Sequence, residues 1–448
     1  MVSDGDGTLF RAFTNGWVPW SVLVGPDGKV VFSENEFDES GFSAAIQRMY
    51  EAPAEAAPAT RRAVRAAGCT VVLGGGIGGV VAARELRQRL PSEHRVVVVD
   101  RSAEHVFQPS LLWQMVGRRR PEQFGRALAG LGSKGIEVRR GEVTRLDLEN
   151  RVVSTSSGDL AYDSLVVSLG AQLAPETVNG FDRMAYDLYT REGCAQIHDA
   201  LRGFTEGTIG ILITELPFKC PAAPYEAAFL AEALVRGNGV RRNVDIHLFT
   251  PEHTPMPVAP RALGDSIADM LAARGIHYHP LFTFEELRPE TREVVSSDGS
   301  AHAVDLLIAI PPHRAPDVVR SSPLLGLSGF VHVDPRTLRT DYDDVYAIGD
   351  IATIKLPNGK ALPKAGVFAH AEAKVVAQRI ADAARGEVST ATFDGKGYCF
   401  IELGDGRAGF AGGDFYAEPE PEIKIRRPGR PLHWGKVALE KWWLHRWL

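Results

Sequence analysis

Short apolar runs alternate with stretches of helical periodicity over most of the chain, from residue 69 to about residue 384. The clearest example is the apolar run at residues 70–73, which leads into a glycine-rich turn, an amphipathic stretch and a second apolar run, RVVVVD. Short apolar runs separated by helical patterns are typical of parallel strands joined through helices. The pattern therefore predicts an α/β fold with parallel sheets in this part of the chain.

The segments before and after this α/β region differ from it in composition. Residues 1–50 hold two apolar runs, in WSVLVGPDGKVVF, around a Pro-Asp-Gly turn signal, and then the helical stretch SGFSAAIQRMY. This order resembles the second half of a thioredoxin-like domain, but no cysteine precedes Cys69, so we expect a truncated module without redox chemistry. Residues 51–68 are rich in Ala, Pro and Arg and predict a linker. Residues 389–448 form a C-terminal region that ends in clustered tryptophans.

The length and composition of the chain fit a protein of two or three domains. The chain has 448 residues, of which 44% are hydrophobic and 24% charged, and one core rarely extends over so many residues. The net charge of -6 argues against a nucleic-acid partner. No window of about 20 apolar residues predicts a membrane span, and residues 1–10 lack the features of a secretory signal. Only four cysteines occur, which predicts a reducing, cytoplasmic location.

A glycine-rich turn gives the strongest chemical signal. Gly74, Gly76 and Gly79 follow the first apolar run with the spacing Gly-x-Gly-x-x-Gly. The first glycine permits a tight turn, the second lets the backbone approach a pyrophosphate, and the third allows close helix–strand packing. The helix N-terminus supplies amide donors, and Asp100 ends the next strand, where a carboxylate accepts hydrogen bonds from a ribose. We therefore predict a dinucleotide site; a glycine turn without a ligand is the alternative.

Two later segments favour FAD as this dinucleotide. YDSLVVSLGAQLAP ends its apolar run at Gly170, and VYAIGDIA ends its run at Gly349 and Asp350. With the glycine turn, these segments resemble the signatures of flavoproteins with two dinucleotide-binding domains. The resemblance implies that the FAD ribityl chain hydrogen-bonds to Asp350, for which a helix cap is the alternative role. It also implies an FAD-binding domain of residues 69–175 and 330–388 and a second Rossmann-like domain of residues 176–329.

The second of these domains lacks the glycine fingerprint of NADH-dependent enzymes. Its first strand and helix are joined by Pro-Phe-Lys-Cys-Pro-Ala-Ala-Pro, at residues 217–224. Prolines fix the backbone and remove amide donors, and Phe218 is bulky where a pyrophosphate needs bare backbone, so we expect NADH to bind poorly. The same loop offers the thiol of Cys220. Its neighbour Lys219 and the helix that follows predict a lowered thiol pKa; a buried structural cysteine is the alternative.

The motif Lys-Cys-x-x-Ala-Pro around Cys220 resembles the loop of sulfide:quinone oxidoreductases and of the flavocytochrome sulfide dehydrogenase subunit. In those families the cysteine lies beside the flavin and takes part in sulfur transfer. Glu226, in the following helix, is either a local base or a charge in the first helical turn. The families use a second cysteine near the segment NGKALPKAGVFAHAEAK, which here contains none, and Cys399 is the only thiol further downstream. The resemblance also implies that Lys364 stabilises the reduced flavin; a solvent-facing lysine is the alternative.

Aromatic and basic residues crowd the end of the chain. The last 15 residues hold Trp434, Trp442, Trp443 and Trp447 among the basic residues Lys436, Lys441 and Arg446. Such mixtures suit a bilayer interface, where rings enter the headgroup layer and cations meet anionic lipid. The resembling oxidoreductases carry C-terminal amphipathic segments that dock on a membrane and shelter a quinone. We therefore expect peripheral association with the inner face of the cytoplasmic membrane; a packed core helix or a dimer contact is the alternative.

These expectations describe an α/β flavoprotein with two Rossmann-like domains, a small N-terminal appendage and a C-terminal amphipathic tail. Its expected reaction passes electrons from sulfide, or another sulfur donor, through FAD to a quinone. The alternatives are a type II NADH:quinone dehydrogenase, and a flavin-binding electron-transfer subunit or redox-silent regulator. No residue is assigned to a metal ion, and the oligomeric state is left open.

Overall fold

The computed structural model of the chain describes residues 21–24, 30–34 and 68–448, and it divides into two units, Met1–Ala63 and Val64–Leu448. In the first unit, β1 (Ser21–Val24) and β2 (Val30–Glu34) form an antiparallel pair. This pair confirms the two strands predicted from the apolar runs. The helix expected after them, and all but the last residue of the expected linker, lie outside the described residues.

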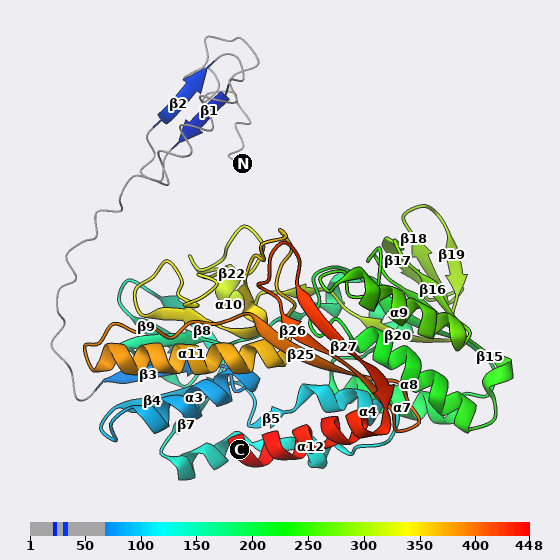
Figure 1. Ribbon diagram of the computed structural model, residues 1–448, viewed down its shortest axis with the longest axis horizontal. Helices are drawn as coiled ribbons and strands as arrows, with labels where there is room; N and C mark the ends of the chain where they lie inside the picture. Colours follow the sequence, from blue (N-terminus) through cyan, green and yellow to red (C-terminus); the bar gives the residue numbers. More distant parts are fainter. Residues whose placement is uncertain (1–20, 25–29, 35–67) are drawn as a thin grey trace. The chain divides into compact units, whose positions relative to one another are not determined.

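A five-stranded parallel sheet forms the first layer of the second unit, in the order β23-β11-β3-β4-β7. Its strands are buried on both faces, because successive valines pack alternately against helices on one face and against an antiparallel sheet on the other. On one face Val72 and Val98 pack against helices α3 and α11, which lie side by side in Figure 1. On the other face Val71 packs with Val153 of the antiparallel sheet β10-β9-β8. The bounds are β3 (Cys69–Leu73), α3 (Ile77–Arg89), β4 (Arg95–Asp100), β7 (Glu137–Arg140), β8 (Val143–Asp147), β9 (Val152–Thr155), β10 (Gly158–Ala161), β11 (Ser164–Val167), β23 (Val345–Ala347) and α11 (Gly366–Ala384).

A second parallel sheet repeats this plan in the order β13-β20-β14-β15-β16. Ile211 and Ile246 pack against helix α8 on one face, whereas Leu212 and Phe249 meet the antiparallel sheet β17-β18-β19 on the other. The two sheets confirm the expected pair of Rossmann-like layers. The bounds are β13 (Ala185–Asp187), α7 (Arg191–Gly203), β14 (Gly207–Ile213), α8 (Ala223–Gly237), β15 (Val244–Phe249), α9 (Arg261–Ala273), β16 (Ile276–His279), β17 (Phe284–Arg288), β18 (Glu293–Ser296), β19 (Ala301–Ala303) and β20 (Leu306–Ile310).

The C-terminal region is a folded layer in which a three-stranded antiparallel sheet precedes a helix (Figure 1). Its elements are β25 (Lys396–Glu402), β26 (Ala408–Asp414), β27 (Glu422–Gly429) and α12 (Arg430–Trp447). The expectation that the aromatic and basic residues of α12 dock on a membrane is contradicted for three of them, which pack as the alternative of a core helix predicts. Trp443 and Trp447 join the main hydrophobic core, and Lys436 is buried as well. Trp434 and Trp442 remain exposed, at 67% and 51%.

Shorter elements complete the second unit. Helix α4 (Leu111–Met115) lies beside α7 and α8, and it lines the core with Trp113, which is fully buried. Among the described residues, no helix is long and apolar enough to cross a membrane. The remaining elements are β5 (Glu104–Val106), α5 (Pro121–Phe124), β6 (Gly125–Ala127), β12 (Gln172–Leu173), α6 (Phe181–Met184), β21 (His313–Arg314), α10 (Asp317–Arg320), β22 (Val331–His332) and β24 (Ala352–Thr353).

Candidate flavin and sulfur site

The glycine turn between β3 and α3 has the geometry that a pyrophosphate requires. Gly74 has a φ of +99°, a conformation that L side chains rarely adopt. A Cβ on Gly79 would lie 1.8 Å from the carbonyl oxygen of Gly74, so only glycine lets the helix approach the strand. A Cβ on Gly76 would meet no protein atom within 4 Å. The chain therefore leaves open space beside the backbone of Gly76, at the N-terminus of α3, where phosphate oxygens can be bound.

Asp100 lies at the end of β4 and holds this turn. Its Oδ2 accepts a hydrogen bond from the amide of Gly75 at 2.5 Å, and its Oδ1 accepts one from the amide of Ser102 at 2.6 Å. On the other side of the turn, Nδ1 of the buried His105 lies 2.8 Å from the carbonyl oxygen of Gly75. Asp100 is half-buried, so its carboxylate stays accessible at the edge of the turn. This position is compatible with the predicted contact to a ribose.

The other two predicted flavin segments meet the same sheet. Gly170 follows β11 and has a φ of +68°, and a Cβ added to it would meet no atom within 4 Å. The amide of Gly349 donates to Oε2 of Glu372 at 2.6 Å, and burial raises the pKa of Glu372 to about 7. Within residues 68–448, the carboxylate of Asp350 accepts no hydrogen bond from the protein, so its lone pairs are available to a hydroxyl. No motif in the sequence pointed to Glu372 as a residue of this site; the sequence pattern only placed it in a helix.

Lys364 is buried, and its ammonium group contacts the chain segment that follows β23. Its Nζ donates to the carbonyl oxygens of Asp350 at 2.6 Å and Ala352 at 3.2 Å, and lies 3.5 Å from the centre of the Phe330 ring. Burial lowers the pKa of Lys364 to about 8, although Asp350 and Glu372 act in the opposite direction. The alternative of a solvent-facing lysine is therefore wrong. The positive charge of Lys364 is therefore shielded from water, just before α11 begins.

Cys220 stands in the loop before α8 with a φ of 55°, which is unusual for a residue other than glycine. Its amide donates to the carbonyl oxygen of Lys364 at 2.7 Å, and its own carbonyl oxygen accepts from the amide of Ala223 at 2.9 Å. The first bond ties the thiol-bearing loop to the lysine. The second closes the first turn of the helix.

The expectation of a lowered thiol pKa at Cys220 is wrong. Burial raises the pKa of Cys220 to about 12, and the nearby charge of Glu226 adds to the effect. The ammonium of Lys219 lies over the ring of Tyr189, 5.3 Å from its centre, so it does not offset the burial. The thiol is therefore protonated at neutral pH and needs a base before it can act as a nucleophile.

Cys399 reaches the same place from β25. It lines one cavity together with Cys220, and burial, followed by the charges of Cys220 and Glu226, raises its thiol pKa. Glu226 and Lys436 line this cavity too, and they form an ion pair in which Nζ and Oε1 are 2.6 Å apart. Burial disfavours the Lys436 ammonium, but the carboxylates of Glu226 and Glu402 outweigh it and raise the pKa of Lys436.

The cavity has a volume of about 1430 Å³ and extends from the start of α3 to the exposed Trp442 of α12. Most of its lining is apolar. The polar lining includes the two thiols, Lys364 and the Glu226–Lys436 pair, and further charged residues of the C-terminal sheet, among them Asp414, Glu422, Lys424 and Arg426. Further lining residues include Ile77, Phe107, Phe218, Val258, Phe368 and Trp443. An apolar pocket with a few convergent polar groups is typical of a binding site for a small organic molecule.

Two Rossmann-like sheets, a phosphate-binding glycine turn and a buried lysine beside two thiols define the chain as an FAD-dependent oxidoreductase. The residues present fit this cofactor because Gly76 leaves room for its pyrophosphate and Asp350 is free to accept a hydrogen bond. The family of pyridine nucleotide-disulphide oxidoreductases matches residues 69–209 and 225–376. The chain belongs to this family.

Comparison with individual proteins shows which kinds of oxidoreductase the chain is similar to. The mitochondrial sulfide:quinone oxidoreductase of Mus musculus is 28% identical over 364 residues, which cover 78% of each chain. The crystal structure of the sulfide:quinone oxidoreductase of Aquifex aeolicus superposes with a TM-score of 0.76 at 22% sequence identity, and covers 85% of this chain and 91% of that one. The type II NADH:quinone oxidoreductase of Haemophilus influenzae is 23% identical over 353 residues, 69% of this chain and 79% of that protein. The chain is thus similar to the sulfide:quinone oxidoreductases, and more distantly to the NADH enzymes.

Proposed function

We propose that this chain oxidises sulfide, or another small sulfur donor, and reduces a quinone. The observation that carries the proposal is that two thiols, Cys220 and Cys399, line one apolar cavity next to Lys364. A dithiol in such a cavity suits sulfur transfer, and the apolar walls suit the ring and tail of a quinone. The similarity to sulfide:quinone oxidoreductases supports the same function.

The sulfur step joins the incoming sulfur to Sγ of Cys220. In balanced form, Cys–SH and HS⁻ give Cys–S–S⁻, two protons and two electrons. The chemistry that FAD supplies when bound is acceptance of this electron pair and its release to the quinone. The quinone takes up two electrons and two protons when it becomes a quinol, so protons and electrons balance over the whole reaction.

Glu226 is the base that this step requires. Its carboxylate is near enough to raise the pKa of Cys220 by its charge. Burial raises the pKa of Glu226 itself, against the opposing effect of the Lys436 ammonium, which makes this carboxylate a stronger proton acceptor than an exposed one. Glu226 also lies in the first turn of α8, so both roles left open by the sequence coexist in one residue. Lys364, whose carbonyl oxygen accepts the hydrogen bond from the Cys220 amide, supplies a positive charge that favours an anionic reduced cofactor.

Exposed aromatic and aliphatic side chains lie on β25, β27 and α12, and we propose that this patch docks on a membrane. The patch consists of Tyr398, Ile425, Trp434 and Trp442, all of them exposed. Exposed basic residues, Lys424, Arg426, Arg427 and Lys441, flank it. Rings and cations in this arrangement insert into the headgroup layer of anionic lipid. Trp442 and Tyr398 line the cavity too, so a quinone could pass from lipid to the thiols without crossing water.

Anaerobic titration of the purified holoenzyme, with flavin absorbance as the readout, tests the proposal. Sulfide should bleach the flavin, and added quinone should restore its colour. NADH should bleach it slowly, because the loop at 217–224 holds prolines and the buried Phe218 where a pyrophosphate needs backbone amides. Rapid bleaching by NADH but not by sulfide would establish the NADH dehydrogenase instead. Bleaching by neither would point to an electron-transfer subunit or regulator.

Substitution of the thiols assigns the sulfur step to its residue. Cys220→Ser should retain bound flavin and lose most of the sulfide-driven bleaching, since serine cannot form a persulfide. Cys399→Ser should weaken the same reaction. Cys69→Ser is the matched control, because Cys69 starts β3 and does not line the cavity. Wild-type sulfide activity in Cys220→Ser would overturn the assignment.

A further inference from the structure

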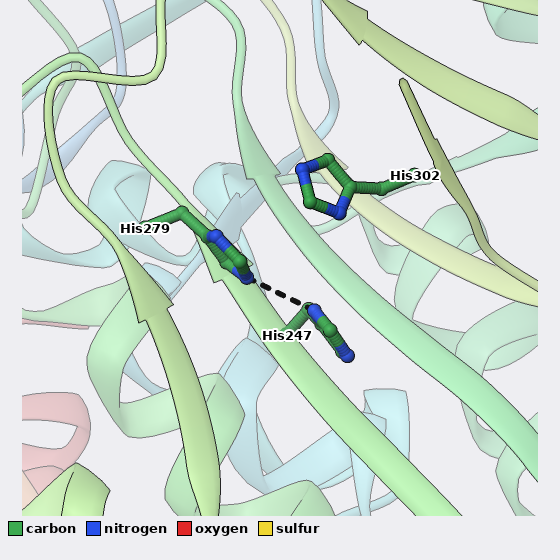
Figure 2. Close-up of side chains that lie close together, drawn as sticks. All are labelled: His247, His279 and His302. Carbon is green, nitrogen blue, oxygen red and sulfur yellow. Dashed lines mark hydrogen bonds between the residues drawn. The ribbon is translucent and has the colours of Figure 1, made fainter. Parts of the chain in front are cut away.

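Three histidines meet on the second Rossmann-like sheet, outside the cavity described above. They are His247 on β15, His279 on β16 and His302 on β19 (Figure 2). One ring nitrogen of each lies within 4.8 Å of one ring nitrogen of each of the others. Nδ1 of His247 and Nε2 of His279 are 2.9 Å apart and share a hydrogen bond. None of the three residues lines the cavity that contains the thiols.

The strand register explains why the rings converge. β15 and β16 are parallel neighbours, with Phe249 opposite His279, so the side chains of His247, Phe249 and His279 share one face of the sheet. The antiparallel sheet β17-β18-β19 covers this face, and its strand β19 contributes His302. The ring of Phe249 stacks on His279 at 4.7 Å between centres and lies 5.0 Å from the ring of His302. A phenyl ring therefore forms one wall of the cluster.

We propose that His247, His279 and His302 bind a divalent transition-metal ion, with zinc as the reference ion. Neutral imidazole is a preferred ligand of zinc, copper and nickel, and three histidines with an open fourth position form a known zinc geometry. Zn–N bonds of about 2.0–2.1 Å in a tetrahedron place the nitrogens about 3.4 Å apart. The three nitrogens lie within 4.8 Å of one another, so the largest separation has to shorten by up to about 1.4 Å when an ion binds.

Two further observations favour an ion over a simple imidazole stack. Within residues 68–448, no hydrogen bond joins the ring nitrogens of His302 to the protein, although this ring faces the other two. His247, His279 and His302 are all half-buried, so water competes less for their ring nitrogens than it does at an exposed site. An ion at this place would join the edge of the parallel sheet to the sheet that covers it.

Zinc titration of the holoenzyme, freed of affinity tag and of metal, tests the site by calorimetry. We expect one high-affinity zinc per chain. His302→Ala should weaken this binding by more than about 100-fold, because even the loss of a group that only orients a metal ligand weakens binding by about 10–100-fold. His253→Ala is the matched control, since His253 is an exposed histidine of the same sheet region and should leave the affinity unchanged. Flavin absorbance reports that each variant is folded.

X-ray absorption at the zinc edge, on holoenzyme loaded with one equivalent, distinguishes the histidines from the thiols. The proposal predicts nitrogen ligands at about 2.0–2.1 Å and no sulfur at about 2.3 Å. Absence of high-affinity zinc binding by the unsubstituted holoenzyme would overturn the proposal, whatever the variants do. Sulfur in the zinc shell, or equal affinity of His302→Ala and the parent, would overturn it too. None of these three results bears on sulfide oxidation, because the titration and the X-ray absorption report zinc binding alone.

Discussion

Nζ of Lys436, on the last helix, lies 2.6 Å from Oε1 of Glu226, at the start of α8, although 210 residues separate the two in sequence. Both groups are buried, and both line the cavity of the thiols. The pair thus joins α12 to the first turn of α8 through one charge-assisted contact. It also makes the C-terminal helix a part of the site.

Removal of one partner of this pair should be strongly destabilising. Lys436→Met leaves the Glu226 carboxylate buried without its counter-charge, and we expect the free energy of unfolding to fall by about 3–5 kcal/mol. Glu226→Gln combined with Lys436→Met should recover much of this loss. Lys441→Met, on the exposed side of the same helix, serves as the control and should change stability by less than about 0.5 kcal/mol. Urea unfolding followed by fluorescence measures all three.

Gly76→Val should yield folded but colourless protein. A Cβ at residue 76 meets no protein atom within 4 Å, so the fold tolerates it, while the side chain occupies the space in which the pyrophosphate binds. The ratio of flavin to protein absorbance gives the occupancy, and circular dichroism checks the fold. Gly130→Val, at an exposed glycine with equally open surroundings, should retain the flavin. Full flavin occupancy in Gly76→Val would refute the assignment of this turn.

Alkylation of Cys220 should be slow at pH 7 and accelerate as the pH rises. Its pKa of about 12 means that the thiolate is the minor form below that pH, so the rate should increase about tenfold per unit between pH 7 and 9. The alkylation rate rises with pH because deprotonation of the thiol creates the reactive thiolate. Iodoacetamide labelling followed by mass spectrometry of the peptide that contains Cys220 gives the rate. A plateau already reached near pH 8 would show that the thiol pKa is not raised.

Substitution of the two exposed tryptophans should release the protein from lipid without harm to its core. Trp434→Ser with Trp442→Ser should weaken binding to anionic vesicles by more than about tenfold, because each ring contributes apolar area to the interface. Flavin content should stay unchanged, since the buried Trp443 and Trp447 remain. Leu327→Ser, at a fully exposed leucine remote in sequence, is the control for loss of surface hydrophobicity. Vesicle sedimentation measures the effect; equal sedimentation of the double variant and the parent would contradict the proposed patch.

Local patterns were sufficient to predict the glycine turn between β3 and α3. Gly74, Gly76 and Gly79 act within one strand–helix unit, so their spacing alone fixes their geometry. The same holds for the short apolar runs, because a run such as RVVVVD forms a strand that is buried on both faces. The two sheets therefore followed from the sequence.

Contacts between distant segments were not predictable in the same way. The approach of Cys399 to Cys220 depends on how the sheet β25-β26-β27 folds over α8, and no spacing rule encodes that fold. A helical wheel of α12 could not show that Lys436 meets a buried carboxylate rather than lipid phosphate. The raised pKa of Cys220 has the same origin, since its burial comes from the tertiary structure while the expectation considered only its neighbours in sequence. His247, His279 and His302 likewise share no sequence spacing, because they come from three strands in two sheets.

The backbone around Cys220 has a consequence for conformational entropy. Pro221 and Pro224 restrict the chain before it folds, and the two backbone hydrogen bonds of Cys220 fix the loop afterwards. The loop therefore loses little conformational entropy when a substrate binds. The free energy of binding is not reduced by the cost of ordering the Cys220 loop. The same rigidity means that the thiol cannot adapt to a bulky donor. Under the proposed function, a loop of this kind favours the smallest sulfur species, for which fixed alignment matters more than accommodation.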